Sequence, residues 1–281
     1  MAQLLCGAFL LTLDRPLVMG IVNVTPDSFS DGGKFLAGEM AIAHARQLIA
    51  DGADILDVGG ESTRPGAASV GLQEELDRVM PVLEAIRDLR DNGVPVSIDT
   101  QKPAVMKAAV AAGASMINDV NALQAEGAIE ACRDSSVAVC LMHRQGTAET
   151  MQQRPVYGDV VREVGDFLAA RARSCELAGI APNRIVIDPG FGFGKTVEHN
   201  FTLLRQLKSL TRLGYPLLAG YSRKSSLGAI TGRPVEQRLA ASLAAAMIAV
   251  QNGATILRVH DVAETVDVLK IMSAVGQGTA S

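Results

Sequence analysis

The sequence predicts the α/β class and, within it, a single (β/α)8 TIM barrel preceded by an N-terminal β-hairpin. Eight short apolar runs alternate with segments of helical spacing along the chain. A glycine closes several of those helical segments just before the next apolar run. The length of 281 residues suits one barrel, which takes about 250. No linker or change of composition divides the chain, so we expect one domain over residues 1–281.

The strands are expected where apolar residues follow one another without alternation. Residues 1–15 are expected to hold the hairpin, with strands at 3–6 and 9–13 that turn at Gly7. Continuous apolar strands separated by helices indicate a parallel sheet buried on both faces, with a doubly wound sheet as the alternative to the barrel. The eight barrel strands are expected at residues 17–22, 55–58, 94–98, 116–117, 137–142, 185–187, 216–219 and 255–259.

Helical spacing marks the intervening segments. The clearest examples are residues 41–50, 104–112, 160–178, 199–210 and 235–252. Gly52, Gly113, Gly179 and Gly253 stand where a helix C-terminus favours glycine.

Composition excludes several classes of function. A net charge of -4 and 4% aromatic residues argue against a nucleic-acid or anionic-membrane binder. The longest apolar stretch is shorter than the roughly 20 residues that span a bilayer. Four cysteines without C-x-x-C spacing suggest reduced thiols, so we expect a cytoplasmic protein.

Polar or glycine-rich clusters follow every predicted strand. In a barrel of this kind the active site lies at the C-terminal ends of the strands, so these clusters predict the lining of one pocket. The clusters are NVTPDSFSDGG from Asn23, GGESTRPG from Gly59, Asp99-Thr100, Asn118-Asp119, Met142-His143, DPGFGFGK from Asp188, GYSRKS from Gly220 and RVHD from Arg258.

Each cluster also has a simpler structural interpretation. Asp99 and Asp188 could cap the helices that follow them, and Asn118 could satisfy its own turn. The glycine-rich DPGFGFGK lacks phosphate-loop spacing. Arg258 and His260 could form a surface cation pair. We assign no role to His44 or His199. For His143 the sequence does not decide between a structural and a functional role.

Taken together, the clusters divide into two chemical halves. Asp99, Asn118 and Asp188 would offer acceptors and an amide to a planar heterocycle with a guanidine-like edge, beside the polarisable Met142. Lys224, Arg258, His260 and Asn23, with Arg64 nearby, form a cationic half suited to a phosphate or diphosphate.

These motifs, in this order, resemble those of dihydropteroate synthases over residues 23–261. The resemblance implies condensation of 6-hydroxymethyl-7,8-dihydropterin diphosphate with p-aminobenzoate to give 7,8-dihydropteroate and diphosphate. It also implies a Mg²⁺ cofactor, a homodimer and sensitivity of the family to sulfonamides.

The resemblance assigns a role to each motif residue in this chain. Asp27, Arg64 and Lys224 are expected to be catalytic, Asp27 by stabilising a pterin cation. The pterin site is expected at Asp99, Asn118, Met142, Asp188 and Lys224. The diphosphate site is expected at Asn23, Thr63, Arg64, Arg258 and His260, with Asn23 also contacting Mg²⁺. The p-aminobenzoate site is expected at Phe29, Thr63, Arg64, Pro65, Phe193, Ser222 and Lys224.

The expected reaction passes through an SN1-like pterin cation, which needs charge stabilisation and exclusion of water more than a strong base. Departures from the family pattern are confined to Arg144, Ala148 and Tyr221. Two alternatives remain open: a barrel like the methyltetrahydrofolate methyltransferases, which should lack the diphosphate set, and a non-catalytic pterin-binding paralogue.

Overall fold

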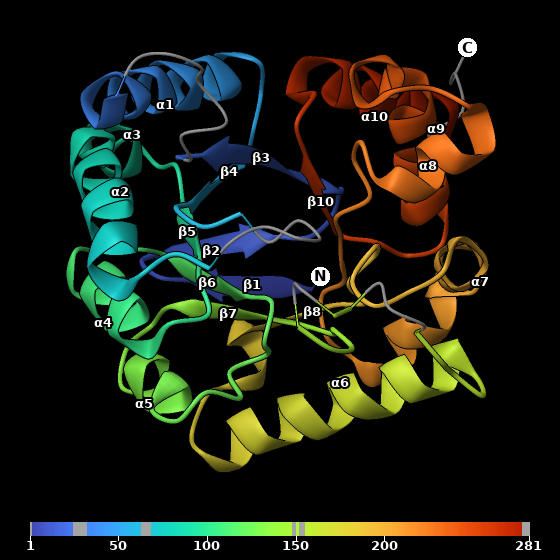
Figure 1. Cartoon of the computed structure of the whole chain (residues 1–281), viewed down its shortest axis with the longest axis horizontal. Coiled ribbons are helices and arrows are strands. Elements are labelled where there is room, and N and C mark those ends of the chain that lie inside the picture. The colour runs from blue at the N-terminus through green and yellow to red at the C-terminus, as the bar shows by residue number, and fades with distance from the viewer. Residues whose placement is uncertain (1, 25–32, 63–68, 148–149, 152–154, 277–281) are drawn as a thin grey trace.

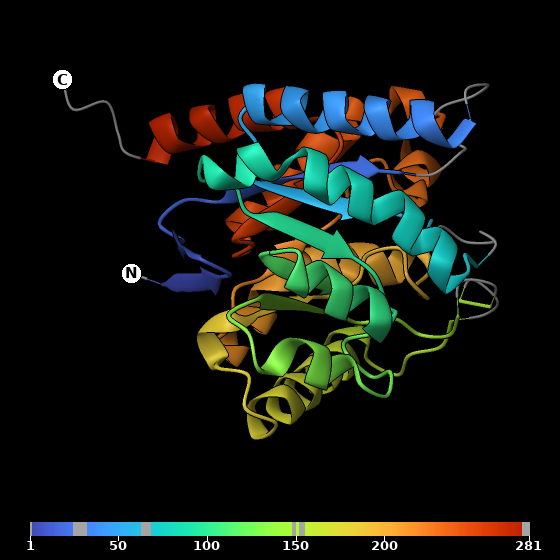
Figure 2. The same ribbon diagram turned by 90° about the vertical axis from the view of Figure 1, so that its left-hand side faces the viewer.

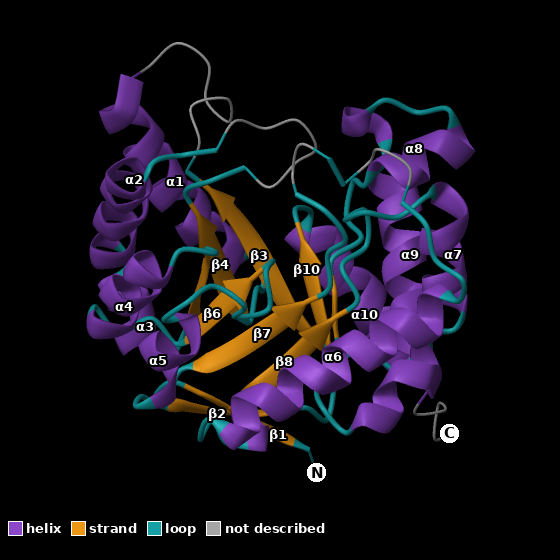
Figure 3. Cartoon of the chain, turned by 60° about the horizontal axis from the view of Figure 1, so that its bottom comes forward, coloured by secondary structure: helices purple, strands orange, loops and turns teal. Residues whose placement is uncertain are grey.

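The computed structural model describes residues 2–24, 33–62, 69–147, 150–151 and 155–276. Eight parallel strands form the central sheet and helices surround it (Figures 1 and 3). Its strands are β3 (Leu17–Asn23), β4 (Ile55–Gly59), β5 (Val96–Asp99), β6 (Met116–Asp119), β7 (Ala138–Met142), β8 (Ile185–Asp188), β9 (Leu218–Ala219) and β10 (Ile256–Val259).

The sheet closes on itself. Its strands run in the order β8-β7-β6-β5-β4-β3-β10-β9. A parallel bridge between Ile187 and Leu217 joins the two ends, and the Ile187 N–H donates to the Pro216 carbonyl at 3.0 Å. The predicted barrel is therefore confirmed, and the doubly wound alternative is wrong.

Helices cover the outside of the barrel. They are α1 (Gly33–Ala50), α2 (Leu72–Ala85), α3 (Arg87–Asp91), α4 (Pro103–Ala111), α5 (Ala128–Arg133), α6 (Val160–Leu177), α7 (Val197–Arg205), α8 (Ser225–Thr231), α9 (Leu239–Gln251) and α10 (Val262–Gly276). Among the described residues, no helix has the length and apolar character needed to cross a membrane.

The glycines predicted to end helices do so. Gly52, Gly113, Gly179 and Gly253 all have φ between 90° and 104°, a region that L side chains rarely adopt. Two predicted helices are shorter than expected. α7 ends at Arg205, where the Asn252 side-chain amide donates a hydrogen bond to the Leu204 carbonyl at 3.0 Å. α9 begins only at Leu239, after a short 3-10 turn.

The hairpin of β1 (Gln3–Cys6) and β2 (Phe9–Thr12) covers the N-terminal end of the barrel. Leu4 and Cys6 are fully buried there, in a cluster with inward-facing residues such as Met19 and Met116. In Figure 2 the dark blue hairpin lies opposite the tips of the strand arrows, which mark the C-terminal ends. The hairpin thus closes the N-terminal end of the barrel and leaves the C-terminal end uncovered by it.

Because the hairpin seals the face remote from the strand ends, we expect Leu4→Ala to reduce stability without changing catalysis. The cavity left by a fully buried leucine should cost about 2–5 kcal/mol. Chemical denaturation measures this cost, and kcat/KM per active site should stay unchanged. Leu10→Ala, at a position that is 55% exposed in β2, is the control and should cost far less. Equal losses for both variants would contradict the assigned packing.

Candidate active site

Six of the eight strands, β3 to β8, each place an inward-facing residue at the C-terminal mouth of the barrel. Asn23, Gly59, Asp99 and Asn118 stand side by side in register across β3 to β6. Met142 and Asp188 are paired in the same way across β7 and β8. Side chains of paired residues in a parallel sheet share a face, so these groups point into the same mouth.

Glycines keep that mouth open. A methyl group at Gly59 would lie 3.4 Å from the Asp99 Cβ, and one at Gly220 would lie within 3.9 Å of both Arg258 and Asp188. Side chains at these two positions would fill the space between the polar groups. The two glycines therefore leave Asp99, Asp188 and Arg258 without a covering side chain at these positions.

Arg258 connects the polar groups of the mouth. Its Nε donates to Asp57 Oδ2 at 2.6 Å, and its Nη2 donates to Asp99 Oδ2 at 2.8 Å. The Asn118 amide donates to the same Asp57 oxygen at 3.0 Å. Arg258 was predicted for the cationic half, and the structure brings it into contact with the carboxylate half.

Asp57 is the functional candidate that the sequence did not reveal. It is fully buried one layer below Asp99, and its Oδ1 has no hydrogen-bond partner among the described residues. Its only sequence signal is a carboxylate in the middle of an apolar strand, ILDVG. Such a residue is costly unless it is paired, which is the clue that could have found it.

Burial shifts the pKa values of the site carboxyls. It raises the pKa of Asp99 to about 7, although Arg258 opposes the shift. It raises the pKa of Asp188 to about 6, opposed by the Gly190 N–H and by the cations around it. Burial also works against the charge of Arg258, but Asp57 and Asp99 outweigh it and raise the pKa of that guanidinium.

The capping interpretation of the two aspartates does not hold. Asp99 accepts from Arg258, and α4 begins after Lys102 without a side-chain cap. Asp188 Oδ1 accepts from the Gly190 N–H at 2.7 Å, which fixes the turn after β8 and caps no helix. Asn118 likewise binds Asp57 rather than its own turn. The three residues are therefore held as pocket groups.

The loops after β8 and β9 meet at Lys224. Its ammonium lies 4.2 Å from the centre of the Phe193 ring, a cation–π distance. Phe193 packs in a small buried cluster with Met142, Val120 and Met151. The structure thus brings together Met142, Phe193 and Lys224, which the sequence assigned to neighbouring parts of two substrate sites.

The loop after β9 is anchored to β10 through Arg223 and Asp261. Arg223 has a left-handed backbone, with φ of 57°, and its guanidinium forms two hydrogen bonds with the Asp261 carboxylate. The Ser222 hydroxyl lies 3.1 Å from His260 Nδ1. Ser222, predicted for the p-aminobenzoate site, and His260, predicted for the diphosphate site, are therefore adjacent, and Arg223 supports the turn that contains Ser222 and Lys224.

The histidines separate into structural and site residues. His143 is buried, its Nδ1 lies 2.9 Å from Lys195 Nζ, and burial together with that lysine lowers its pKa to about 3. It is therefore a neutral structural acceptor. His199 completes the N-terminal capping box of α7 with Thr196, so the decision to assign it no chemistry is supported.

Five predicted site residues lie outside the described residues: Asp27, Phe29, Thr63, Arg64 and Pro65. The structure does describe the residues that precede these two segments, at the C-terminal ends of β3 and β4. Asn23 ends β3, and Glu61 follows β4 with its carboxylate 2.6 Å from Lys102 Nζ.

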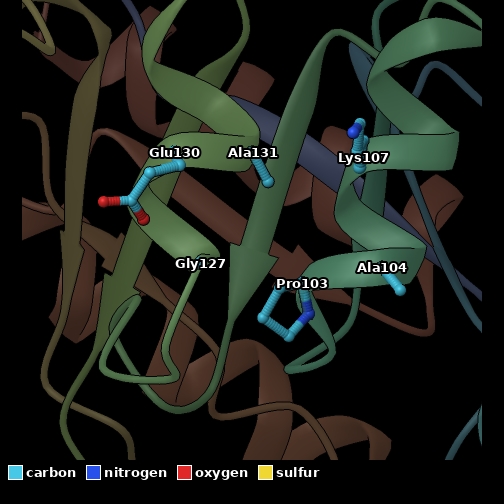
Figure 4. A pocket seen from close by; sticks show the side chains of 6 residues that line it. All are labelled: Pro103, Ala104, Lys107, Gly127, Glu130 and Ala131. Atoms are coloured by element: carbon cyan, nitrogen blue, oxygen red, sulfur yellow. The ribbon is translucent and has the colours of Figure 1, made fainter.

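A separate groove of about 360 Å³ lies on the outer surface between α4 and α5 (Figure 4). Its lining residues come from α4, α5 and the residue before α5, and none of the predicted site residues is among them. It is lined by Pro103, Ala104, Lys107, Gly127, Glu130 and Ala131.

Comparisons with known proteins identify the family of this barrel. Residues 19–260 match the model of the pterin binding enzyme family. A dihydropteroate synthase of Neisseria meningitidis serogroup C is 52% identical over 275 residues, which cover 96% of each chain. The chain belongs to the dihydropteroate synthase family of pterin-binding enzymes.

Solved structures of the family agree with this assignment over almost the whole chain. A Xanthomonas albilineans dihydropteroate synthase with 4-aminobenzoic acid shares 55% identity and a TM-score of 0.92, with 98% of each chain covered. A Burkholderia cenocepacia dihydropteroate synthase complexed with 7,8-dihydropteroate shares 54% identity and a TM-score of 0.90, with 98% of this chain and 97% of that chain covered. The family's members are transferases, and its barrel is the architecture found here.

The raised pKa of Asp188 predicts an acid limit for pterin binding. A guanidine-like edge needs the carboxylate, and as the pH falls below about 6 protonation removes that charge. We expect the affinity for a free pterin, measured by calorimetry, to fall about tenfold for each further pH unit.

The matched control for this titration is Asp188→Asn. This variant should bind the pterin weakly, and its affinity should no longer fall as the pH drops below about 6. The affinity of Asp99→Asn should still show that fall. An affinity that is independent of pH down to about pH 5 in the unaltered protein would contradict the assignment.

Proposed function

We propose that this chain joins 6-hydroxymethyl-7,8-dihydropterin diphosphate to p-aminobenzoate, releasing diphosphate and forming 7,8-dihydropteroate. One observation carries the proposal: Asp99, Asn118, Asp188 and Arg258 converge on one open mouth, beside Lys224 and Phe193. Family membership supports it, because relatives of about 50% identity over nearly the whole chain are dihydropteroate synthases.

The pterin half of the mouth suits a flat ring with several N–H donors. Asp188 would take the amino group and the neighbouring ring N–H in two parallel hydrogen bonds. Asp99 and Asn118 would meet further edges of the ring, and Met142 would lie against its face. These groups are held by Arg258, Asp57 and Gly190 before any ligand arrives, so little ordering remains for binding to supply.

The diphosphate half would be formed by Arg258, His260 and the region around Asn23. Only two of the five N–H donors of Arg258 are used by Asp57 and Asp99 in hydrogen bonds described above, so the same guanidinium can face an anion. Ser222 supports the His260 ring. This arrangement would place positive charge where the leaving group accumulates negative charge.

The residues present fit a magnesium ion that is bound chiefly through the substrate. Among the described residues, no cluster of three or more His, Cys, Asp or Glu could hold a metal. Mg²⁺ commonly takes one or two protein oxygens plus substrate phosphates, and the Asn23 amide at the barrel mouth is such an oxygen. When bound there, the ion would neutralise charge on the departing diphosphate.

We propose that diphosphate leaves before the amine attacks. The C–O bond to the diphosphate breaks, the electron pair goes to the leaving oxygen, and the pterin carries a delocalised cation. The arylamine nitrogen then forms the new C–N bond and loses a proton. Asp27, expected beside the cation, and Lys224 and Phe193, which border the acceptor side, would orient these partners. Attack of the amine before diphosphate release, seen by pre-steady-state trapping, would refute this order.

The activity is tested with purified protein, Mg²⁺, pterin diphosphate and p-aminobenzoate, by following dihydropteroate. We expect product formation. Tight pterin binding without product would favour the non-catalytic paralogue, and methyl transfer from a methylated folate would favour the methyltransferase alternative. The family comparisons favour neither.

His260→Ala tests the diphosphate half. Loss of one donor to the leaving group should lower kcat by on the order of 100-fold. His44→Ala, on the exposed surface of α1, is the matched control and should leave kcat unchanged. Equal rates for the two variants would remove His260 from the site.

We propose further that the protein is a cytoplasmic homodimer. α9 buries Ala245 and Ala249 against the barrel and exposes Met247 and Ile248. α10 lies beside α9 (Figure 1). It exposes Ile271 and Val275. The four cysteines are buried and unpaired, which suits a reducing compartment.

The dimer is tested by sedimentation. Ile248→Glu should shift the mass toward that of one chain, because a charge would be buried in the contact. Leu177→Glu, on α6 and away from this surface, should leave the mass unchanged. A single-chain mass for the unaltered protein would contradict the proposal.

A further inference from the structure

Lys195 is a buried lysine to which the sequence assigned no function. Only 2% of it is exposed, and it follows β8 by seven positions. Its Nζ lies 2.9 Å from His143 Nδ1 and 3.0 Å from the carbonyl oxygens of Gly190 and Phe193. Three acceptors match the three N–H groups of an ammonium. Burial nevertheless lowers the pKa of Lys195 to about 7, although the nearby Asp188 opposes the shift.

The contacts of Lys195 hold the loop formed by residues 190–195 against the end of β7. This loop needs such support because Gly190, Gly192 and Gly194 all have positive φ. A side chain at Gly190 would overlap the His143 carbonyl, and one at Gly194 would overlap the Gln145 carbonyl. The loop thus lies directly on the strand-end segment that contains His143.

Other side chains bind the same loop from its outer side. The Asn200 amide accepts from the Gly192 N–H at 2.7 Å and donates to the Lys195 carbonyl at 3.3 Å. The Tyr157 hydroxyl donates to the Gly194 carbonyl at 2.8 Å. Asn200 is as deeply buried as Lys195, but Lys195 differs from both side chains in that its Nζ binds two loop carbonyls, those of Gly190 and Phe193, at once.

Phe193 is the reason that this loop matters for chemistry. Lys195 binds the Phe193 carbonyl, and the Phe193 ring lies beneath the Lys224 ammonium. A methyl group at Gly192 would lie 3.1 Å from the Lys224 Cδ, so the loop backbone also borders that side chain. The position of the loop therefore sets the position of the surface that faces the acceptor substrate.

We propose that Lys195 is a positioning residue for the acceptor side of the active site, acting through Phe193 and Lys224. The inference rests on the proposed function, because it assumes that p-aminobenzoate lies against these two residues. Under the proposed function, Asp99 and Asn118 also hold the pterin, and Lys195 forms no hydrogen bond with either of them among the described residues. Loss of Lys195 should therefore affect the aminobenzoate more than the pterin.

Lys195→Met tests the proposal, with Arg184→Met as the matched control. Arg184 is also buried and also binds three carbonyls, those of Val137, Arg133 and Cys132. It lies at the N-terminal end of β8, on the opposite face of the barrel from the C-terminal strand ends. Both substitutions remove a buried cation from a carbonyl cluster, so their effects on thermal stability should be comparable.

Steady-state kinetics, normalised to the concentration of active sites, separates the two variants. Because displacement of a binding group by about 1 Å can cost on the order of 100-fold, Lys195→Met should raise KM for p-aminobenzoate about tenfold or more. Its affinity for the pterin, measured by calorimetry, should change by less. Arg184→Met should leave both constants within about twofold of the unaltered protein, since it lies on the barrel face whose residues govern stability.

Lys195→Gln keeps N–H donors and decides the question where Lys195→Met does not fold. A raised KM for p-aminobenzoate in either Lys195 variant supports the proposal. An unchanged KM, or the same rise in Arg184→Met, overturns it. Failure of the unaltered protein to form dihydropteroate would instead overturn the proposed function, so the two failures are distinguished.

Discussion

The buried contact of Arg258 with Asp57 and Asp99 is the interaction on which the site depends. Charges that leave water need partners of opposite sign, and the cost of leaving one unpaired is about 3–5 kcal/mol. Here one guanidinium from β10 satisfies carboxylates from β4 and β5, and Asn118 from β6 adds a further donor. Four strands are thereby tied together at the mouth, and the groups that would recognise a pterin are oriented by the same contacts.

That contact also links the predicted pterin half of the site to the predicted diphosphate half. Separate pterin and diphosphate groups would act independently, whereas Arg258 touches the carboxylates of one half and belongs by position to the other. Charge that accumulates on a leaving group near Arg258 would be sensed at Asp99, whose raised pKa already reflects a balance between burial and this cation. Under the proposed function, binding at one half would therefore be coupled electrostatically to the protonation of Asp99 in the other.

Much of the fold and part of the site could be predicted from the sequence, for physical reasons that particular residues make clear. Uninterrupted apolar runs located the barrel strands, and glycines such as Gly52 and Gly253 marked helix ends because only glycine adopts their φ values readily. Asp99, Asn118 and Asp188 stand at strand ends, where packing does not require polar groups. Asp57 was missed because a strand buried on both faces shows no alternation, so nothing in ILDVG tells which side Asp57 faces. Lys195 was missed because two of its partners are backbone carbonyls and the third, His143, is 52 positions away in the sequence, so no local pattern of side chains records these contacts.

The two ends of β8 illustrate how one kind of contact can serve different purposes. Arg184 precedes the strand and Lys195 follows it, and each neutralises the carbonyls of a neighbouring turn from a buried position. At the first end the carbonyls belong to the C-terminus of α5 and to the residue that precedes β7, and rigidity there stabilises the barrel. At the second end the carbonyls belong to a loop whose Phe193 ring lies against Lys224, and under the proposed function rigidity there would determine where p-aminobenzoate lies. A cation formed in the mouth would be captured by water unless the amine were already in place, so a loop held by buried contacts, rather than one ordered only on binding, suits this reaction.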